Sequence, residues 1–257
     1  MLQIILTLLL SSINLGALGS VVLWRNLVNI GDTISHAIIL CLVAEYFFSI
    51  PTAIGAIIIS IIFIILIGLF SNENSNQNIS MIIFSGVSVA ITVLVSDMTN
   101  GELKIRDFVV GDVLSSGVTE VITSVVMLIF ISYFLYRYYK ELIIISISSE
   151  VAIIHGIKTN YINFIVNLIL AISISISIQL VGVLLMTSFL VIPASIARIY
   201  SVSPWQMILL SSSISAACSL LAILLSIYYD IGFSPVVILI LACVYLCSFC
   251  IKNMRDT

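Results

Sequence analysis

The sequence contains very little charge. It has 9 basic and 12 acidic residues among 257, and charged residues make up 8% of the chain against 61% hydrophobic ones. A soluble globular domain carries about a quarter charged residues, so this chain has too few solvating groups to cover a water-facing surface. The apolar excess is therefore expected to face lipid, which indicates an integral membrane protein.

Basic clusters and nucleotide-binding motifs are also absent from the sequence. The net charge is −3, and because phosphate binding needs clustered Lys and Arg, nucleic acid is not expected as a partner. The sequence contains no P-loop, no G-x-S-x-G and no H-E-x-x-H motif. We therefore do not expect an enzyme, and any ATP that the protein uses must be hydrolysed by another chain.

Cysteine is sparse and forms no recognisable framework. Cys41, Cys218, Cys243, Cys247 and Cys250 lie in apolar stretches, without zinc-finger spacing or a disulfide pattern. We interpret them as small apolar side chains. The last three share one helix face at i, i+4 and i+7, where a soft metal could bind, but no second ligand cluster faces them.

Charge-free stretches predict the membrane spans. A helix needs about 20 residues to cross ~30 Å of hydrocarbon, so the charge-free stretch 159–197 is divided near Gln179 and Gly182. The segment 38–48 is short, and it is either the end of a span that begins in the preceding polar stretch or a re-entrant piece. The prediction is an all-α polytopic bundle of about eight to nine segments, at 3–23, 34–49, 52–70, 79–96, 118–138, 161–178, 180–197, 205–228 and 232–251.

Lys and Arg predict the orientation of the chain. Arg137, Lys140 and Lys158 form the largest positive group, and placing their loop in the cytoplasm puts the N-terminus outside and the C-terminus inside. The first residues lack a basic region and a cleavage site, so they are interpreted as the start of the first span. No linker is visible, and 1–257 is expected to form a single transmembrane domain.

Asp32 and His36 are the most informative ionisable residues. They lie in the stretch GDTISHA (Gly31–Ala37), and a helix brings residues four apart to one face. Carboxylate and imidazole are ligands for zinc or manganese, so the pair forms half of a metal site. In the alternative interpretation, Asp32 caps a helix that begins at Thr33 and His36 makes a hydrogen bond within the bundle. Ser35 does not suit a nucleophile–base pair, because adjacent helical residues point about 100° apart.

Two further acidic residues are candidates for lining an ion path, because ionisable groups at membrane depth are costly and usually functional. Glu45 lies in an apolar stretch, where it either lines the path or reaches an interface. Asp112 follows Gly111 in a polar stretch, where it could contact the ion on entry. Glu45, together with Asp32 and His36, also allows a competing interpretation as the proton relay of a secondary transporter.

The segment 140–160 predicts a short cytoplasmic helix between two spans. Ser149 can cap this helix, Glu150 occupies its first turn, and Gly156 can end it. Such a helix can dock into a groove on a soluble partner. The alternative is an interfacial helix that only joins the two spans.

Three stretches resemble one family. GDTISHA (Gly31–Ala37), SEVAIIHGI (Ser149–Ile157) and VGVLLMTSFLVIPASIAR (Val181–Arg198) resemble characteristic segments of bacterial metal-uptake ABC permeases, and most closely those of the membrane subunit of high-affinity zinc uptake systems. The resemblance covers essentially the whole chain. This sequence departs from the family pattern in having Ser149 in place of an acidic residue, and Cys41 and Glu45 in place of small ones.

The resemblance implies a type II ABC importer-like fold that takes up zinc, with manganese or iron as the alternative. It implies a permease homodimer in the bacterial cytoplasmic (inner) membrane, two ATP-binding subunits and an extracytoplasmic metal-binding protein. Asp32 and His36 then match residues that coordinate the transported Zn²⁺ or Mn²⁺, without a permanently bound cofactor. Glu150, Ala152 and Gly156 match the contact with the ATPase, in a coupling helix at about 149–157.

Overall fold

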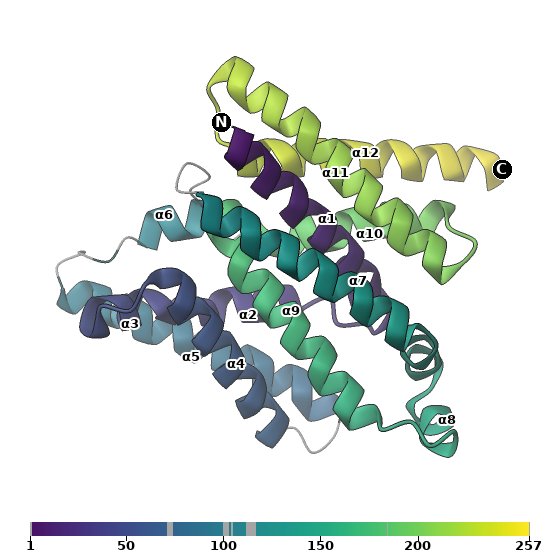
Figure 1. Cartoon of the computed structure of the whole chain (residues 1–257), viewed down its shortest axis with the longest axis horizontal. Helices are drawn as coiled ribbons and strands as arrows, with labels where there is room; N and C mark the ends of the chain where they lie inside the picture. The colour runs from purple at the N-terminus through teal and green to yellow at the C-terminus, as the bar shows by residue number, and fades with distance from the viewer. Residues whose placement is uncertain are drawn as a thin grey trace. The chain divides into compact units, whose positions relative to one another are not determined.

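The computed structural model describes residues 2–70, 74–99, 103, 105–111, 117–183 and 185–256. In this part of the chain every regular element is an α-helix (Figure 1). In chain order the helices are α1 (Leu2–Trp24), α2 (Ile30–Ile38), α3 (Leu40–Phe48), α4 (Thr52–Phe70), α5 (Asn74–Met98), α6 (Ile105–Val110), α7 (Val118–Ile147), α8 (Ser149–Ile154), α9 (Thr159–Val181), α10 (Met186–Tyr200), α11 (Pro204–Tyr229) and α12 (Phe233–Asp256).

The predicted all-α, multi-pass membrane architecture is confirmed, but the predicted number of spans is not. Within the described residues, 7 helical stretches are long and apolar enough to cross a bilayer. Two other predicted spans correspond to shorter apolar helices, Thr52–Gly68 and Met186–Tyr200. A helix of this length needs tilting or a locally thinner bilayer to cross, so length alone does not establish eight or nine spans.

The long charge-free stretch is divided as predicted, although the boundary lies slightly later. α9 ends at Val181, and Gly182 takes a φ of +83°. The Gly182 N–H donates to the Ile178 carbonyl at 2.7 Å. Glycine adopts this left-handed conformation without steric cost, which is why it commonly ends helices. α10 then begins at Met186.

The short apolar segment before Pro51 is longer in the structure than its apolar run suggested. α2 begins at Ile30, and α2 and α3 together form an apolar stretch from Ile30 to Phe48. The two helices meet at Ile39, whose N–H donates to the His36 carbonyl at 3.3 Å in a tighter, three-residue turn. This length favours the interpretation in which the span begins in the preceding polar stretch.

The helices group into two compact units. Unit 1 is built mainly from α1, α7, α8, α10, α11 and α12, and unit 2 mainly from α2 to α6 and α9. The single transmembrane domain expected for the chain stays a prediction.

In unit 1, small residues allow α1 to pack closely against its neighbours. α1 packs against α7 and α11. A Cβ added at Gly16 would lie 2.8 Å from the Ser211 carbonyl oxygen of α11, and the Ser211 hydroxyl donates to the Gly16 carbonyl at 2.6 Å. On the α7 side, Asn14 donates from Nδ2 to the Ser124 carbonyl at 3.1 Å. Close backbone approach and buried hydrogen bonds are what hold helices together in lipid, where apolar surface alone gives no driving force.

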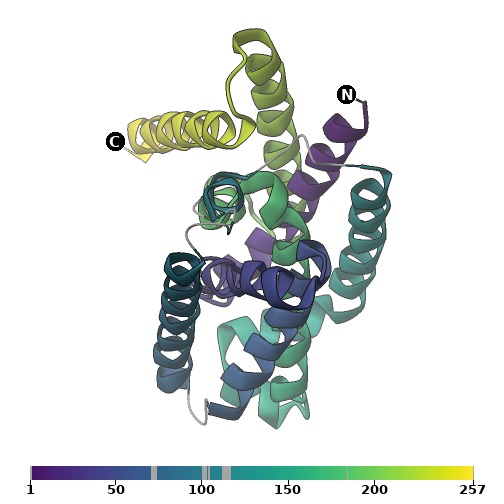
Figure 2. The same ribbon diagram turned by 90° about the vertical axis from the view of Figure 1, so that its left-hand side faces the viewer.

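Unit 2 holds α2 between other helices. α2 packs against α4 and α5, and α3 packs against the same two helices (Figure 1 and Figure 2). α9 joins α4 through two hydrogen bonds: the Ser175 hydroxyl donates to the Ala56 carbonyl at 3.2 Å, and Gln179 Nε2 donates to Thr52 Oγ1 at 3.3 Å. This packing fixes the helix that carries Asp32 and His36.

Candidate metal site

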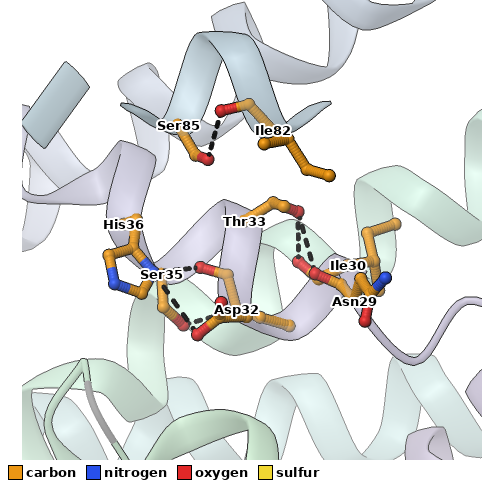
Figure 3. A network of polar contacts seen from close by, with 9 residues as sticks. Asn29, Ile30, Asp32, Thr33, Ser35, His36, Ile82 and Ser85 are labelled. Carbon is orange, nitrogen blue, oxygen red and sulfur yellow. Dashed lines mark hydrogen bonds and ion pairs between the residues drawn. The ribbon is translucent and has the colours of Figure 1, made fainter. Parts of the chain in front are cut away.

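Local hydrogen bonds in α2 satisfy its buried hydroxyl groups (Figure 3). The Thr33 hydroxyl donates to the Asn29 carbonyl at 3.0 Å, and the Ser35 hydroxyl donates to the Gly31 carbonyl at 2.6 Å. Both residues are buried. Ser35 is therefore not bonded to His36, and the structure agrees with the sequence argument against a hydrolase pair.

Asp32 and His36 form the accessible part of α2. The side chain of Asp32 is 55% exposed and that of His36 29%, whereas the other α2 residues are buried. His36 Nδ1 lies 3.4 Å from Asp32 Oδ1. The predicted approach of the two side chains on one helix face is therefore present, and both side chains are partly exposed.

A backbone contact orients the imidazole of His36. Nδ1 lies 2.7 Å from the carbonyl oxygen of Asp32. Since a carbonyl oxygen only accepts, Nδ1 is the donor in this bond, and the lone pair of Nε2 is left available for a metal. The contact is exposed and local to α2, so it is not a hydrogen bond to another helix of the bundle, and it is compatible with a ligand role.

The helix-cap interpretation of Asp32 is wrong. α2 begins at Ile30, its N-cap is Asn29, and Asp32 lies inside the first turn. Asn29 is the N-cap, and Ile30 and Gly31 already lie in the helix, so Asp32 is not needed to begin it. Its carboxylate is instead directed to the accessible side, where His36 lies (Figure 3).

Glu45, one of the two candidate path residues, does not join this pair in the structure. Glu45 is exposed on α3. In the described part of the chain, no three His, Cys, Asp or Glu side chains come close enough to hold one ion, so Glu45 does not complete a three-ligand group with Asp32 and His36. Asp112 lies outside the described residues. A path-lining role for both stays a prediction.

The cysteines separate into buried and exposed ones. Cys41 and Cys218 are buried, whereas Cys243, Cys247 and Cys250 are exposed on α12. The described residues hold no three-ligand group at α12. Burial of Cys41 and Cys218 fits small apolar side chains.

A short helix, α8, is present in the predicted segment, with one correction to its cap. The N-cap is Ser148 rather than Ser149, since the Ser148 side chain accepts from the Val151 N–H at 3.4 Å. Gly156 ends the helix as predicted, with a φ of +74°. The Gly156 N–H donates to the Ile153 carbonyl at 2.9 Å and the Ile157 N–H to the Ala152 carbonyl at 3.0 Å, which is the Schellman arrangement.

α8 is held by one side chain and leaves the others accessible. Ala152 is fully buried, and α8 packs against α7. Val151, Ile153 and Ile154 are 44%, 62% and 83% exposed, and Glu150 in the first turn is exposed. A short helix with exposed apolar residues is suited to contact a partner protein or the bilayer interface.

One polar residue across from α2 was not predicted from the sequence. Ser85 of α5 lies across from α2 in Figure 3. A serine in a long apolar helix gives no signal of its own, and only the packing of α5 on α2 brings it to this place.

Comparisons with known proteins point to one family. The model of the ABC 3 transport family matches residues 1–252 of this chain. The high-affinity zinc uptake system membrane protein ZnuB of Buchnera aphidicola subsp. Schizaphis graminum is 32% identical over 244 residues, covering 93% of this chain and 93% of that protein. The manganese import system permease protein ScaB of Streptococcus gordonii is 24% identical over 236 residues, covering 91% and 84%.

A solved structure shows the same fold. The chain resembles one chain of PsaBC from Streptococcus pneumoniae in complex with Fab, with a TM-score of 0.83 and 23% identity. The match covers 96% of this chain and 90% of that one. The two chains therefore share a similar arrangement of helices over nearly their whole length.

Proposed function

Because the chain belongs to the ABC 3 transport family, we propose that it is the membrane-spanning permease subunit of an ABC importer for divalent transition-metal ions, with zinc preferred. The observation that carries the proposal is the similarity to ZnuB at 32% identity over 93% of both chains. ATP is hydrolysed by a separate subunit, and the permease itself is a translocation path rather than an enzyme.

Asp32 and His36 coordinate the ion in transit. Their exposure, their shared helix face and the free lone pair on Nε2 of His36 support this role. Two ligands from each of two permease copies give four, the number that suits a tetrahedral zinc ion. With only two ligands from one chain the site is weak until the copies meet, and a site that conducts must also release its ion.

α8 is the contact with the ATP-binding subunit. Glu150 and the exposed apolar residues of α8 supply the surface, the buried Ala152 anchors the helix, and Gly156 ends it. Motion of α8 would then tilt the spans around the path. An extracytoplasmic metal-binding protein delivers the ion to the permease homodimer in the inner membrane of a bacterium, where the N-terminus lies outside and the C-terminus inside.

Manganese or iron is the alternative cargo within the same family. The similarity to ScaB, described as a manganese import permease, favours this alternative, although at 24% identity it is more distant than ZnuB. Carboxylate and imidazole ligands suit both zinc and manganese. The ligand types therefore do not separate the two ions, and uptake must be measured.

The test is the uptake of radioactive zinc and manganese by cells that express the chain with its ATP-binding and metal-binding partners. We expect zinc to enter, manganese to be excluded, and uptake to continue when an uncoupler collapses the proton gradient while ATP is maintained. Preferential manganese entry would favour the alternative cargo. Uptake that stops with the uncoupler at constant ATP would contradict the ABC mechanism and favour a proton-coupled transporter.

A further inference from the structure

α5 carries hydroxyl residues along one side and packs against α2, the helix that carries Asp32 and His36. Ser85, Ser88 and Thr92 are spaced i, i+3 and i+7 and lie on one side of α5. Val87 and Leu94, about half a turn away from Ser85, are 49% and 59% exposed and suited to face lipid. Ser88 and Thr92 are buried, so the hydroxyl side of α5 differs in burial from the side that carries Val87 and Leu94.

Ser85 is the accessible member of this hydroxyl face. Ser88 and Thr92 are 6% and 0% exposed, whereas Ser85 is half-buried. Its hydroxyl points toward the turn of α2 that carries Asp32 and His36 (Figure 3). Asp32 and His36 are themselves the accessible residues of α2, and Ser85 lies across from this helix in Figure 3.

The hydrogen bond that Ser85 makes determines whether its hydroxyl can act as a donor or as an acceptor toward a ligand. Its hydroxyl donates to the Ile82 carbonyl of its own helix at 3.0 Å. A serine hydroxyl has one donor and two acceptor lone pairs, so with the donor engaged the group presents an acceptor oxygen. Beside a carboxylate and an imidazole, an acceptor oxygen suits the water molecules bound to a cation, which point their hydrogens outward.

We propose that Ser85 positions the transported ion at the Asp32–His36 site by accepting a hydrogen bond from an ion-bound water molecule. The inference rests on the proposed function, and it adds a residue of α5 to the two on α2. An ion held by two side chains of one chain keeps water on its other positions, and such bridging water is nearly as favourable as a direct contact. A neutral hydroxyl strengthens binding without the charge that would slow release.

The experiment is the concentration dependence of zinc uptake by the full complex of permease, ATP-binding subunit and metal-binding protein. We expect Ser85→Ala to raise KM for zinc about fivefold, as loss of one hydrogen bond predicts, with little change in the maximal rate. Ser85→Thr keeps the hydroxyl and should restore KM. Ser88→Ala, which removes a buried hydroxyl from the same face, is the matched control and should leave KM unchanged.

Chemical labelling provides a second measurement that does not depend on turnover. In a background with Cys243, Cys247 and Cys250 changed to Ser, a Ser85→Cys variant should react with a water-soluble thiol reagent, and Zn²⁺ alone should slow this reaction. A Val87→Cys variant, on the lipid side of α5, should react more slowly, and Zn²⁺ should leave its rate unchanged.

The outcomes separate this inference from the proposed function. Wild-type zinc uptake with an unchanged KM in Ser85→Ala, or equal zinc protection of the cysteines at 85 and 87, overturns the role of Ser85 and leaves the permease intact. A raised KM in Ser88→Ala and Ser85→Thr alike would show a structural effect and also overturn it. Failure of the wild-type complex to take up zinc overturns the proposed function, and the inference with it.

Discussion

The contact of α1 with α10 in unit 1 gives a quantitative prediction. A Cβ added at Gly19 would lie 2.0 Å from the backbone oxygen of Leu190 and 3.2 Å from the Cβ of Ala194. Because a backbone oxygen cannot rotate away, Gly19→Ala must push the two helices apart. Overpacking of this kind costs about 1–3 kcal/mol, and this contact belongs at the upper end. The better helix propensity of alanine returns up to about 1 kcal/mol.

We therefore expect Gly19→Ala to lower the free energy of unfolding by about 2 kcal/mol. For a chain of this size that corresponds to a fall of about 4–8 °C in the apparent Tm. The assay is thermal denaturation of the detergent-solubilised protein, followed by the fraction that remains monodisperse. In the described structure a Cβ at Gly86 of α5 meets no heavy atom within 4 Å, so Gly86→Ala is the matched control and should be neutral or slightly stabilising.

The comparison of these two variants decides the argument. If Gly19→Ala denatures at the same temperature as Gly86→Ala, the close approach of α1 and α10 is not present in the protein. A fall in both variants would instead show that alanine is poorly tolerated in either helix for reasons other than the contact with Leu190.

Two further predictions concern transport. Gly156→Ala places a Cβ on a residue with φ +74°, which destabilises the end of α8 by about 1 kcal/mol. We expect this variant to lower the zinc-dependent ATPase rate of the complex more than it weakens zinc binding. An unchanged ATPase rate would contradict the role of α8. The triple change of Cys243, Cys247 and Cys250 to Ser should leave zinc uptake within about twofold of wild type, because exposed thiols on α12 have no partner in the proposed path.

The fold was predictable from the sequence where lipid determines it. Each predicted span has a helical counterpart because a continuous apolar run in lipid must satisfy its backbone groups internally. The ends of the helices were less predictable. A charge-free stretch indicates which residues contact lipid, but a helix can continue beyond the lipid-facing part. The predicted span 118–138 ends where α7 has non-helical backbone angles at Tyr138, and the helix then continues to Ile147 through the charged residues Lys140 and Glu141.

The site was predictable only within a single helix. The approach of Asp32 to His36 follows from a spacing of four, and the end of α8 follows from Gly156. Ser148 and Ser149 are both favourable N-cap residues. Which of them caps α8 depends on where the backbone enters the helix, and the sequence does not distinguish two adjacent serines. Ser85 could not be predicted, because its place beside α2 depends on how two distant segments pack.

The central claim is that Asp32 and His36 hold the ion during transport. It is tested most directly by zinc uptake in the full complex with Asp32→Ala and His36→Ala at equal membrane abundance. The matched control is Glu141→Ala, an acidic residue of α7 that pairs with Arg137 at 3.8 Å, also in an i, i+4 arrangement. We predict at least about a tenfold loss of uptake in both site variants and none in the control. Normal uptake in the Asp32 and His36 variants would show that the pair is structural and would contradict the assigned site.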